Sequence, residues 1–566
     1  MPADNLLSLG AGNGSNVESV KASSSALRGT LREELSQPTD AFDESNAQLL
    51  KFHGSYQQED RDQRRARRER GTGKAYQFMV RTRIPGGVLT AQQYLIEDEL
   101  ARLYGNGTLR ITTRQGFQLH GVVKGDLRAT IARINAAGLT TLAACGDVNR
   151  NVMTCPRPAK TAAERAAQAA AREIAEHLAP RTGAYREIWI DGEKLADTQD
   201  LHEEPLYGKT YLPRKFKIGI ALPSDNCVDI YTQDIGLVAD INGDELRGFT
   251  VLVGGGMGMT HGKKETFPRL GTPLCFVVPD DVSAVVEAIV GTFRDWGDRS
   301  NRKHARFKYV VEERGIEWIR ADIERRIGRP LALPRNVTFA GAEDHLGWHP
   351  QDDGRWTLGI FVENGRIKDQ PEQRLRTALR TVIDRFRPGV RLTGQQNILL
   401  TGVRPEQLAE IALIFASHGV RIDPREHGIR RHAMACPALP TCGLALTDAE
   451  RVLPSVVAEI GAEMQRLGIA GRALSVRMTG CPNGCARPYM GDIGFVGRSK
   501  DLYDIFIGGD WANTRLNRVY AGAVPLAELA GRVAPLLRRW RDEASENESF
   551  GDFYHRLQHE RTVPAA

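Results

Sequence analysis

An internal repeat is the feature of this sequence that most constrains its fold. Residues 110–122 (RITTRQGFQLHGV) match residues 391–403 (RLTGQQNILLTGV) at six of thirteen positions, at an offset of 281 residues. A second pair of matching segments, residues 234–238 (DIGLV) and 492–496 (DIGFV), has a shorter offset. Self-similarity of this kind is typical of a duplicated unit. The sequence therefore predicts two copies of one unit, which differ in length between the two landmarks.

The two copies are predicted to begin with the same order of elements. The first copy reads as a strand (78–84), a helix (90–103), a strand over the repeat and a helix (126–137). The second copy gives the same four elements at residues 356–362, 374–386, 391–403 and 405–418. This order is typical of small ferredoxin-like half-domains, and we expect the two to pack as a pseudosymmetric pair. The predicted fold class is α+β, with a mixed α/β catalytic domain after each half-domain.

These landmarks divide the chain into five expected regions. They are an arm with an N-terminal extension (1–70), the first half-domain (71–145), the first α/β domain (146–345), the second half-domain (346–425) and the second α/β domain (426–566). Residues 1–45 are rich in Ser, Asn, Gly and Asp, with little periodicity. That composition predicts a flexible arm.

Four cysteines in the second copy form the strongest chemical signal. Cys436 and Cys442 have five residues between them, Cys481 and Cys485 have three, and 38 residues separate the two pairs. Thiolates are soft ligands, and four of them complete the ligand set of a [4Fe-4S] cluster. A structural zinc site is the alternative, although such sites favour Cys-x2–4-Cys spacing.

The first copy keeps only part of this pattern. The 281-residue offset carries Cys436 onto Cys155 but Cys442 onto Thr161. We therefore interpret Cys155 as a buried remnant of the duplication. The other cysteines are scattered singly, at positions 145, 227 and 275, so eight cysteines in 566 residues do not indicate a disulfide framework. A reducing compartment fits this usage.

Composition and charge exclude several classes of partner. The N-terminus lacks a basic segment followed by an apolar core, and no stretch approaches the roughly 18 apolar residues that cross a bilayer. We expect a soluble, cytoplasmic protein without a membrane partner. The net charge of +6 is modest, and the six arginines of residues 61–70 are interrupted by acidic residues without aromatic residues nearby. This run favours a solvated helical face over a nucleic-acid site.

Basic and polar residues are expected to share the faces of several strands, because alternate residues of a strand point the same way. The first copy gives a row of Arg110, Thr112, Arg114, Gln118 and His120, and the second copy gives Arg391, Thr393, Gln395 and Asn397. Further cations lie at Arg81 and Arg83, Arg150, Lys215 and Lys217. Residues 110–124 and 210–223 contain no acidic residue. Loose surface ion pairs are one interpretation, but the lack of local carboxylates favours a multiply charged anionic ligand.

The cysteine block, with TGCPNGC at residues 479–485, resembles the siroheme and [4Fe-4S] signature of the sulfite and nitrite reductase family. The resemblance extends over about residues 45–555. Further segments are similar to the haemoproteins of assimilatory sulfite reductases within this family. They are HGSYQQ (53–58), RIPGG (83–87), NRNV (149–152), YLPRKFK (211–217) and GGG (254–256).

The resemblance implies a role for each matching residue. Cys436, Cys442, Cys481 and Cys485 are expected to ligate the cluster, and Cys485 also to bind the siroheme iron. Siroheme carries eight carboxylates in this family, and these would pair with the cations of the strand faces. The glycines at 254–256 would let the backbone approach the cofactor closely. Contacts to the cofactors are expected from Arg110, Arg114, Gln118, His120, Arg214, Gly255, Gly256, Gln396, Asn397 and Asn483. The catalytic pocket for the substrate oxyanion is expected to consist of Arg81, Arg150, Lys215 and Lys217.

The activity that the resemblance implies is the six-electron reduction of sulfite to sulfide, in sulfate assimilation and cysteine biosynthesis. Two alternatives stay open: a ferredoxin-dependent sulfite or nitrite reductase, and a non-catalytic iron-sulfur electron carrier. The sequence has no Gly-x-Gly-x-x-Gly fingerprint, so this chain is not expected to take hydride from NADPH by itself. We expect a separate electron donor, either a flavoprotein subunit or a ferredoxin.

Overall fold

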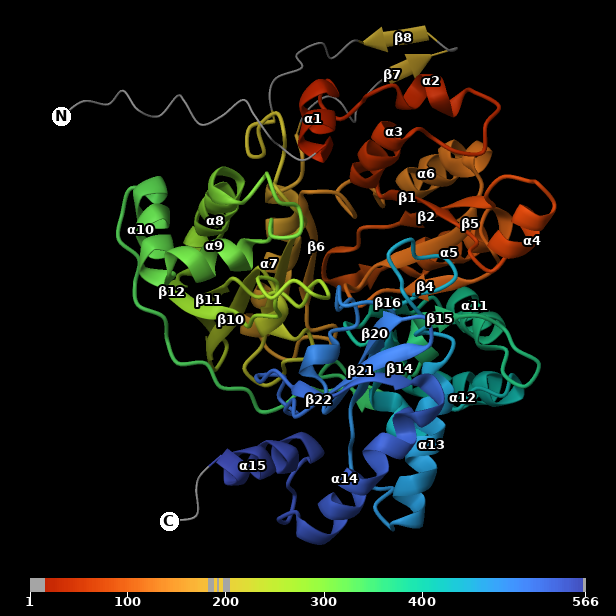
Figure 1. Cartoon of the computed structure of the whole chain (residues 1–566), viewed down its shortest axis with the longest axis vertical. Coiled ribbons are helices and arrows are strands. Elements are labelled where there is room, and N and C mark those ends of the chain that lie inside the picture. Colours follow the sequence, from red (N-terminus) through yellow and green to blue (C-terminus); the bar gives the residue numbers. More distant parts are fainter. Residues whose placement is uncertain (1–15, 182–187, 191–192, 197–203, 563–566) are drawn as a thin grey trace.

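The structure, a computed structural model, describes residues 16–181, 188–190, 193–196 and 204–562 (Figure 1). It contains four five-stranded sheets and one two-stranded sheet, the latter made of β7 (Ile188–Ile190) and β8 (Glu193–Ala196). Two of the large sheets belong to the half-domains and two to the α/β domains. None of the described helices combines the length and the apolar character that a bilayer-spanning helix needs.

The half-domain sheets exchange a strand with each other. The first has the order β1 (Ser55–Glu59), β2 (Tyr76–Arg81), β5 (Phe117–Val122), β4 (Leu109–Ile111) and β15 (Arg366–Ile367). The second has the order β13 (Gly347–Pro350), β14 (Trp356–Ile360), β17 (Ile398–Val403), β16 (Gly389–Leu392) and β3 (Val88–Leu89). Thus β15 of the second copy completes the sheet of the first, and β3 of the first copy completes the sheet of the second.

Two glycines allow the exchanged strands to approach so closely. Gly87 precedes β3 and Gly365 precedes β15, with φ of +72° and +75°. A Cβ at Gly87 would lie 2.5 Å from the carbonyl oxygen of Leu392, and a Cβ at Gly365 would collide with the carbonyl oxygen of Ile111. Positive φ and missing space both require glycine at these two positions.

The half-domains share one hydrophobic core. Helices α5 (Ala91–Leu103) and α6 (Leu127–Ala136) belong to the first copy, and α11 (Leu375–Phe386) and α12 (Leu408–Ser417) to the second. The helix α5 begins with a capping box between Thr90 and Gln93, packs against α11, and contributes to a core that runs through both copies. These helices confirm the four that the hydrophobic periodicity predicted.

Each repeat segment forms a hairpin, so the single strand predicted over it was wrong. The first hairpin turns at Thr112–Gly116 between β4 and β5, and the second turns between β16 and β17. Gln115 and Gln396 adopt positive φ at equivalent points of the two turns. The Thr112 hydroxyl accepts hydrogen bonds from the backbone N–H groups of residues 114 and 116, which stabilises the turn. Side chains therefore alternate between the two faces within each strand, but this alternation does not continue across the turn.

The two α/β domains repeat one sheet topology. The sheet of the first copy has the order β6 (Asn149–Thr154), β9 (Phe216–Ala221), β10 (Ile235–Asn242), β11 (Glu245–Val253), β12 (Thr272–Val277). The sheet of the second copy has the order β18 (Ala433–Ala435), β19 (Val476–Thr479), β20 (Ile493–Ser499), β21 (Leu502–Ile507), β22 (Arg518–Pro525). Ile235 pairs with Ile218 in the first, and Ile493 pairs with Val476 in the second. The register therefore relates this part of the copies by an offset of 258 residues.

Helices accompany both α/β sheets. They are α7 (Ala162–His177), α8 (Val282–Trp296), α9 (Phe307–Arg314) and α10 (Ile316–Ile327) in the first, and α13 (Leu453–Arg466), α14 (Leu529–Glu543) and α15 (Phe550–Thr562) in the second. Two pairs of them correspond: α7 and α13 follow the first strand of each sheet, and α8 and α14 follow the last. Each domain has its own hydrophobic core. In Figure 1 the two helical groups lie at the left and at the bottom, with the half-domain sheets between them and the N-terminal helices.

The N-terminal region is folded from residue 16 onward, so the prediction of a flexible arm over residues 1–45 was wrong there; residues 1–15 lie outside the described residues. Three helices, α1 (Asn16–Ser23), α2 (Leu31–Leu35) and α3 (Glu44–Leu49), precede β1. Lys21 is buried, and its Nζ donates to the carbonyl oxygen of Leu212 at 2.9 Å. Such long-range contacts are invisible in the local composition.

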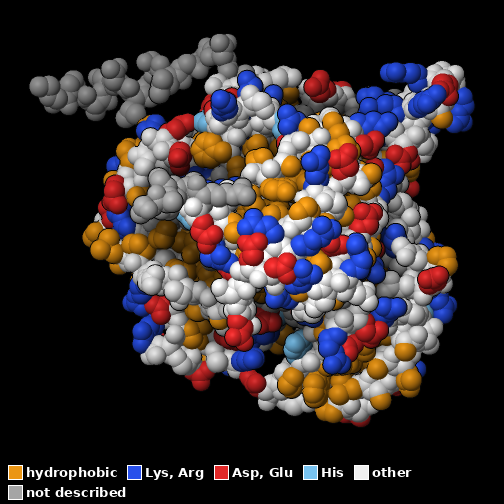
Figure 2. Space-filling model, turned by 60° about the horizontal axis from the view of Figure 1, so that its bottom comes forward, with side chains coloured by type: hydrophobic (Ala, Val, Ile, Leu, Met, Phe, Trp, Pro, Cys, Tyr) orange, Lys and Arg blue, Asp and Glu red, His pale blue; other side chains and the backbone are white. Residues whose placement is uncertain are grey.

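The arginine-rich run forms the exposed helix α4 (Arg64–Glu69), as predicted. On the face of the molecule in Figure 2, Lys and Arg side chains are interspersed with Asp and Glu side chains. Arg61, just before α4, differs from the rest of the run. Its Nη1 donates to the carbonyl oxygens of Cys442 and Ala445, at 3.3 and 2.7 Å. Arg61 therefore holds the loop that carries Cys442.

Candidate active site

The four motif cysteines converge at one edge of the second α/β sheet. Cys436 follows β18 directly and Cys481 follows β19 after one residue, and these strands are parallel neighbours. The carboxyl ends of parallel strands meet at one edge, so the two loops start side by side. The backbone N–H of Gly480 donates to Cys436 Sγ at 3.4 Å.

Electrostatic coupling shows that all four thiols lie close together. The pKa of the Cys481 thiol is raised to about 12, mainly by burial and also by the nearby Cys485 and Cys442. The pKa of Cys436 is raised well above its usual value by burial and by the other three cysteines. Such thiols ionise when a cationic group binds them, which is the behaviour of metal-cluster ligands.

Asn483 and Gly484 shape the loop between Cys481 and Cys485. The Asn483 side-chain amide donates to Cys481 Sγ at 3.3 Å. Gly484 has φ of +63°, and a Cβ there would lie 3.0 Å from the carbonyl oxygen of Met257. The loop therefore packs directly against the segment that follows β11.

The glycine segment 254–256 lies in that contact. Gly254 has φ of +79°, and a Cβ at Gly255 would lie 2.5 Å from the carbonyl oxygen of Gln233. At Gly256 a Cβ would meet the ends of the Lys308 and Arg306 side chains at 3.2 and 3.4 Å. The chain's own backbone therefore already requires glycine at position 255, independently of any cofactor.

The predicted pocket cations lie near one another, and Lys215 lies near Cys485. Arg81 ends β2, Arg150 lies in β6, and Lys215 and Lys217 lie at the start of β9, which is parallel to β6. The pKa of Lys215 is lowered to about 7, mainly by burial; the charge of a nearby Cys485 opposes this shift, and the guanidinium groups of Arg306, Arg214 and Arg150 contribute to it. The pKa of Lys217 is also lowered, by burial and then by the charge of Lys215. Lys215, Lys217 and the neighbouring arginines therefore form a buried group of positive charges.

Two residues that hold this pocket were missed by the sequence reasoning. Arg306 Nη2 donates to both carboxylate oxygens of Asp234, at 2.9 and 2.8 Å, and Asp234 accepts from the backbone N–H of Lys217. Lys308 Nζ donates to the carbonyl oxygen of Gly258 at 2.6 Å and so holds the glycine segment. Residues 306 and 308 precede or begin α9, where no pattern distinguishes them from surface cations.

Arg110, in the polar row of the first copy, has a carboxylate partner that the sequence did not predict. Arg110 Nε donates to Glu450 of the second copy at 2.9 Å, and its Nη2 donates to the carbonyl oxygen of Ala435, just before Cys436. Arg110 Nη1 also reaches Gln118 at 3.4 Å. The lack of acidic residues in the local sequence therefore does not leave Arg110 without a carboxylate, because its partner Glu450 lies 340 residues away in sequence.

The remaining residues of the row differ in how their polar atoms are used. Arg114 donates to Gln233 Oε1 at 2.7 Å and to the carbonyl oxygen of Ile218 at 3.1 Å. His120 is buried, and burial together with the nearby arginines lowers its pKa well below its usual value. The His120 ring is therefore neutral at physiological pH.

Gln396 and Asn397 have structural roles in the second hairpin. Gln396 Nε2 donates to the carbonyl oxygen of Asn364 at 3.2 Å, and Asn397 Oδ1 accepts from the backbone N–H of Val362 at 3.0 Å. Among the described residues, Gln396 Oε1 and Asn397 Nδ2 are buried without a hydrogen-bond partner. Arg214, by contrast, lies 4.0 Å from Asp147 at the edge of the cationic pocket.

Buried polar atoms without a partner surround the predicted cofactor site. Within the described ranges they include Arg81 Nε, Arg114 Nε and both ring nitrogens of His120. Folded proteins leave few such atoms, so these polar atoms, of which a neutral His120 ring contributes one donor and one acceptor, require a polar group that the chain does not supply. A tetrapyrrole with several carboxylates fits them, and the four cysteines fit a [4Fe-4S] cluster.

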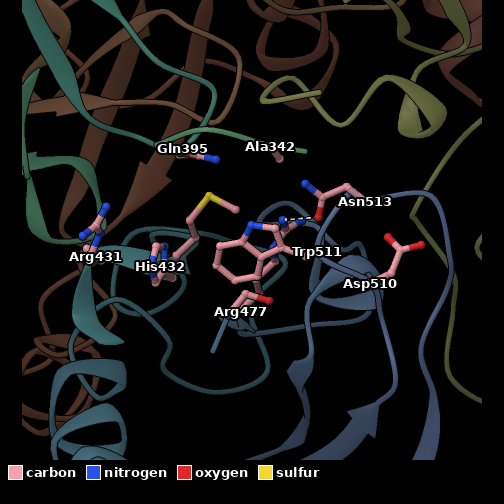
Figure 3. Close-up of a pocket in the computed structure, with 10 residues that line it drawn as sticks. Ala342, Gln395, Arg431, His432, Arg477, Asp510, Trp511 and Asn513 are labelled. Carbon is pink, nitrogen blue, oxygen red and sulfur yellow. Dashed lines mark hydrogen bonds between the residues drawn. The ribbon is translucent and has the colours of Figure 1, made fainter. Parts of the chain in front are cut away.

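The second copy holds the counterpart of the cationic pocket. The offsets of 281 and 258 residues carry Arg114, Arg150 and Lys217 of the first copy onto Gln395, Arg431 and Ser475 of the second. These three counterparts line the pocket in Figure 3. The arginine of Arg150 and Arg431 is thus kept in both copies, whereas Arg114 and Lys217 are replaced by the uncharged Gln395 and Ser475.

The pocket in Figure 3 lacks the positive charge of its counterpart. The Trp511 indole lies in its middle, 4.9 Å from the His432 ring between centroids. Arg431 is neutralised by Asp344 at 2.6 Å, and Asp510 adds a negative charge to the lining. An anionic substrate is therefore expected only in the first-copy pocket.

Comparisons with known proteins agree with this arrangement. The family model described as "Nitrite/Sulfite reductase ferredoxin-like half domain" matches twice, at residues 70–137 and 349–418. The model "Nitrite and sulphite reductase 4Fe-4S domain" also matches twice, at residues 169–331 and 429–562. These matches confirm the predicted duplication and the α+β class.

Two curated relatives are similar over nearly the whole chain. A protein of Myxococcus xanthus is 46% identical over 96% of this chain and 97% of its own length. One of Geobacillus kaustophilus is 46% identical over 95% of each chain. Both are named "Sulfite reductase [NADPH] hemoprotein beta-component".

A solved structure shows the same fold. The Mycobacterium tuberculosis NirA protein superposes with a TM-score of 0.76 over 94% of both chains, at 23% identity. The family models and the curated relatives confirm the family that the cysteine motif indicated. The chain belongs to the nitrite and sulphite reductase family.

Proposed function

We propose that this protein reduces sulfite to sulfide with six electrons, at a siroheme coupled to a [4Fe-4S] cluster. The observation that carries the proposal is a group of buried cations: Lys215 lies near Cys485, and Lys217, Arg150 and Arg306 lie near Lys215. Of these four, Arg306 forms an ion pair, with Asp234. A small oxyanion would neutralise this charge. The names of the two curated relatives support sulfite as that oxyanion.

The geometry of the site and the family resemblance support the following assignment of cofactor-holding residues. Cys436, Cys442, Cys481 and Cys485 would hold the cluster, and Cys485 would also bind the siroheme iron. When bound, the two cofactors supply electrons singly to the substrate sulfur. The siroheme carboxylates would meet the donors of Arg81, Arg114, His120 and Arg214, whereas Arg110 would position the cluster loop through Ala435.

The pocket residues would bind sulfite and deliver protons. Reduction of SO3²⁻ consumes six electrons and seven protons and releases HS⁻ and three waters, so proton supply is part of the task. Lys215, with a pKa of about 7, can give up and regain a proton at Nζ near neutral pH. Arg150 stays charged and would orient the substrate oxygens, since its Nε and Nη1 are anchored on the carbonyl oxygens of Gly146 and Ala144.

The electron donor in this proposal is a separate flavoprotein subunit that oxidises NADPH. The relatives' designation as a beta-component supports a partner of this kind, and the sequence lacks a dinucleotide fingerprint. Ferredoxin is the alternative donor. A cytoplasmic location stays a prediction from cysteine usage.

Steady-state assays test the proposal. The purified protein should show siroheme absorbance and should form sulfide from sulfite with a reduced viologen dye, with a higher kcat/KM for sulfite than for nitrite. Lys217→Met should abolish most of this activity, whereas Lys368→Met, at an exposed position, should not change it. A higher kcat/KM for nitrite would reverse the substrate assignment. An intact cluster without siroheme would indicate an electron carrier.

The donor needs its own experiment. Sulfide formation should be compared with NADPH plus a flavoprotein reductase and with reduced ferredoxin, at equal protein concentration. Turnover with ferredoxin alone would replace the flavoprotein in the proposal and leave the chemistry at the pocket unchanged.

A further inference from the structure

Two cysteines that are far apart in the first copy meet in space. Cys155 follows β6 and Cys227 lies in the loop after β9. Their Sγ atoms lie within 4.8 Å of each other and of side-chain atoms of Asp225 and His345. His345 comes from the connector that leads to the second copy. The sequence reasoning treated Cys155 as a remnant and Cys227 as a solitary cysteine.

The internal duplication explains why these two thiols meet. The 281-residue offset carries Cys155 onto Cys436, and the 258-residue offset of the strand register carries Cys227 onto Cys485. The backbone supports the second match, because Asp229 and its counterpart Arg487 both adopt positive φ before a short 3-10 helix. The first copy thus retains two of the four thiol positions of the cluster site.

Two other side chains complete a set of four donors. Asp225 Oδ2 lies 3.1 Å from Cys155 Sγ and 3.0 Å from His345 Nε2, and the Cys155 Sγ to His345 Nε2 distance is 3.8 Å. A tetrahedral zinc ion with Zn–S of about 2.3 Å and Zn–N or Zn–O of about 2.0–2.2 Å places its ligand atoms roughly 3.3–3.8 Å apart. The three distances lie close to this range without any rearrangement of the backbone.

The surroundings fix the donors in this orientation. Asp225 Oδ1 accepts hydrogen bonds from the backbone N–H groups of Cys227 and Glu343, both at 3.0 Å, so Oδ2 is directed at the cluster of donors. Ligand orientation by such neighbours is typical of metal sites. His345 adopts φ of +58°, a strained conformation for a non-glycine residue.

Burial and charge indicate a closed site. Cys155, Cys227 and Asp225 are at most 2% exposed and His345 is 7% exposed. When a metal ion binds, Cys155 and Cys227 would become thiolates, and with the Asp225 carboxylate they would bring three negative charges into this interior, which is costly without cations. Arg391 reaches the backbone next to Cys155, donating to the carbonyl oxygen of Pro156 at 3.1 Å, and a divalent ion would supply the remaining charge.

We propose that Cys155, Asp225, Cys227 and His345 bind one Zn²⁺ ion in a closed structural site of the first copy. Four protein ligands leave no open position, so this ion takes no part in sulfite reduction. Its role is to fasten the connector before β13 to the loops after β6 and β9. The donor set, with only two sulfur atoms, does not suit a [4Fe-4S] cluster.

Metal analysis of the full-length holoenzyme tests the site directly. Protein from zinc-supplemented cells, dialysed against metal-free buffer, should contain one zinc per chain in addition to its iron. X-ray absorption at the zinc edge should give two sulfur neighbours at about 2.3 Å and two nitrogen or oxygen neighbours at about 2.0–2.2 Å. This edge is specific for zinc, so siroheme and cluster iron do not interfere.

Variants assign the ion to these four residues. Cys227→Ser and the milder Asp225→Asn should lower the zinc content several-fold, whereas Cys275→Ser, at a buried thiol in β12, should retain it. Three results would each overturn the site. They are zinc at background level in the folded wild-type protein, zinc retained by both Cys227→Ser and Asp225→Asn, and a Cys155–Cys227 disulfide in intact-mass analysis. The result does not depend on activity, so it is distinguishable from failure of the proposed sulfite reduction.

Discussion

At the scale of single residues, Lys215 combines a lowered pKa with a position beside Cys485. Its ammonium group is present below a pH of about 7 and is lost as the pH rises through that value. A bound anion favours the charged form, so Lys215 can grip an oxyanion and then donate a proton. This residue therefore links substrate affinity to pH.

We predict that Lys215→Met lowers kcat/KM for sulfite by about 10- to 100-fold at a pH of about 6, because a charge-assisted hydrogen bond is worth roughly 1.5–3 kcal/mol. The ratio of wild-type to variant kcat/KM should shrink as the pH rises above about 7, where wild-type Lys215 loses its charge. Taking the ratio removes the titration of sulfite itself. A ratio that stays constant between a pH of about 6 and about 8.5 would contradict the assignment.

The residues of the site were predictable to different degrees. The four cysteines are recognisable because their spacing and turn residues are local. Glu450, Arg306 and His345 were not recognisable, because each becomes functional or structural through a contact with a residue far away in the chain. A sequence pattern records neighbours along a strand or helix, and it does not record which loops meet at a sheet edge.

At the scale of elements, the exchange of β3 and β15 determines how the half-domains pair. Helix positions followed from periodicity and caps, as with Thr90 at the start of α5. The strand exchange could not be predicted from the sequence, because β3 and β15 have only two residues each and such short segments show no hydrophobic periodicity. The hairpin turns were also missed, since the positive φ of Gln115 and Gln396 comes from turn contacts and not from residue type.

We predict that Gly365→Ala destabilises the protein more than Gly354→Ala. Both glycines have φ near +75°, so both variants share the cost of a side chain in that conformation. Only at Gly365 would the Cβ collide with a backbone oxygen, whereas Gly354 has open space around it. The collision should add about 1–3 kcal/mol.

Apparent Tm values at one scan rate, measured for both variants and the wild type, compare the two positions. Equal losses at the two positions would show that the exchanged strand can shift to accommodate the methyl group.

At the scale of the whole molecule, Glu450 joins the copies. It accepts from Arg110 of the first copy at 2.9 Å and from Arg366 of the exchanged strand β15 at 2.6 Å. Although burial opposes ionisation, the two arginines lower the pKa of Glu450 to about 2. A carboxyl group with a lowered pKa in the folded state stabilises that state above its unfolded pKa of about 4.3.

We predict that Glu450→Gln lowers the free energy of unfolding by about 3 kcal/mol at neutral pH, because it leaves the buried Arg110 without its charge partner. The difference from the wild type should shrink as the pH falls below about 4.3 toward 2, where Glu450 becomes protonated in both states. Urea midpoints at a pH of about 7, 4.5 and 3.5 measure this. Glu317→Gln, whose side chain is 84% exposed, is the control and should change little at any pH.

The exchanged strands also indicate what a single copy of this unit would be. Alone, such a copy would have a four-stranded half-domain sheet with one open edge, and its own short strand would extend away from it. Two identical copies would each donate that strand to the other, which describes a twofold-symmetric homodimer with swapped strands. The present chain has the geometry of such a dimer with its two copies joined in one polypeptide. Because the copies are joined, their sequences can differ, and in the proposed function one copy binds anions while the other holds the iron-sulfur cluster.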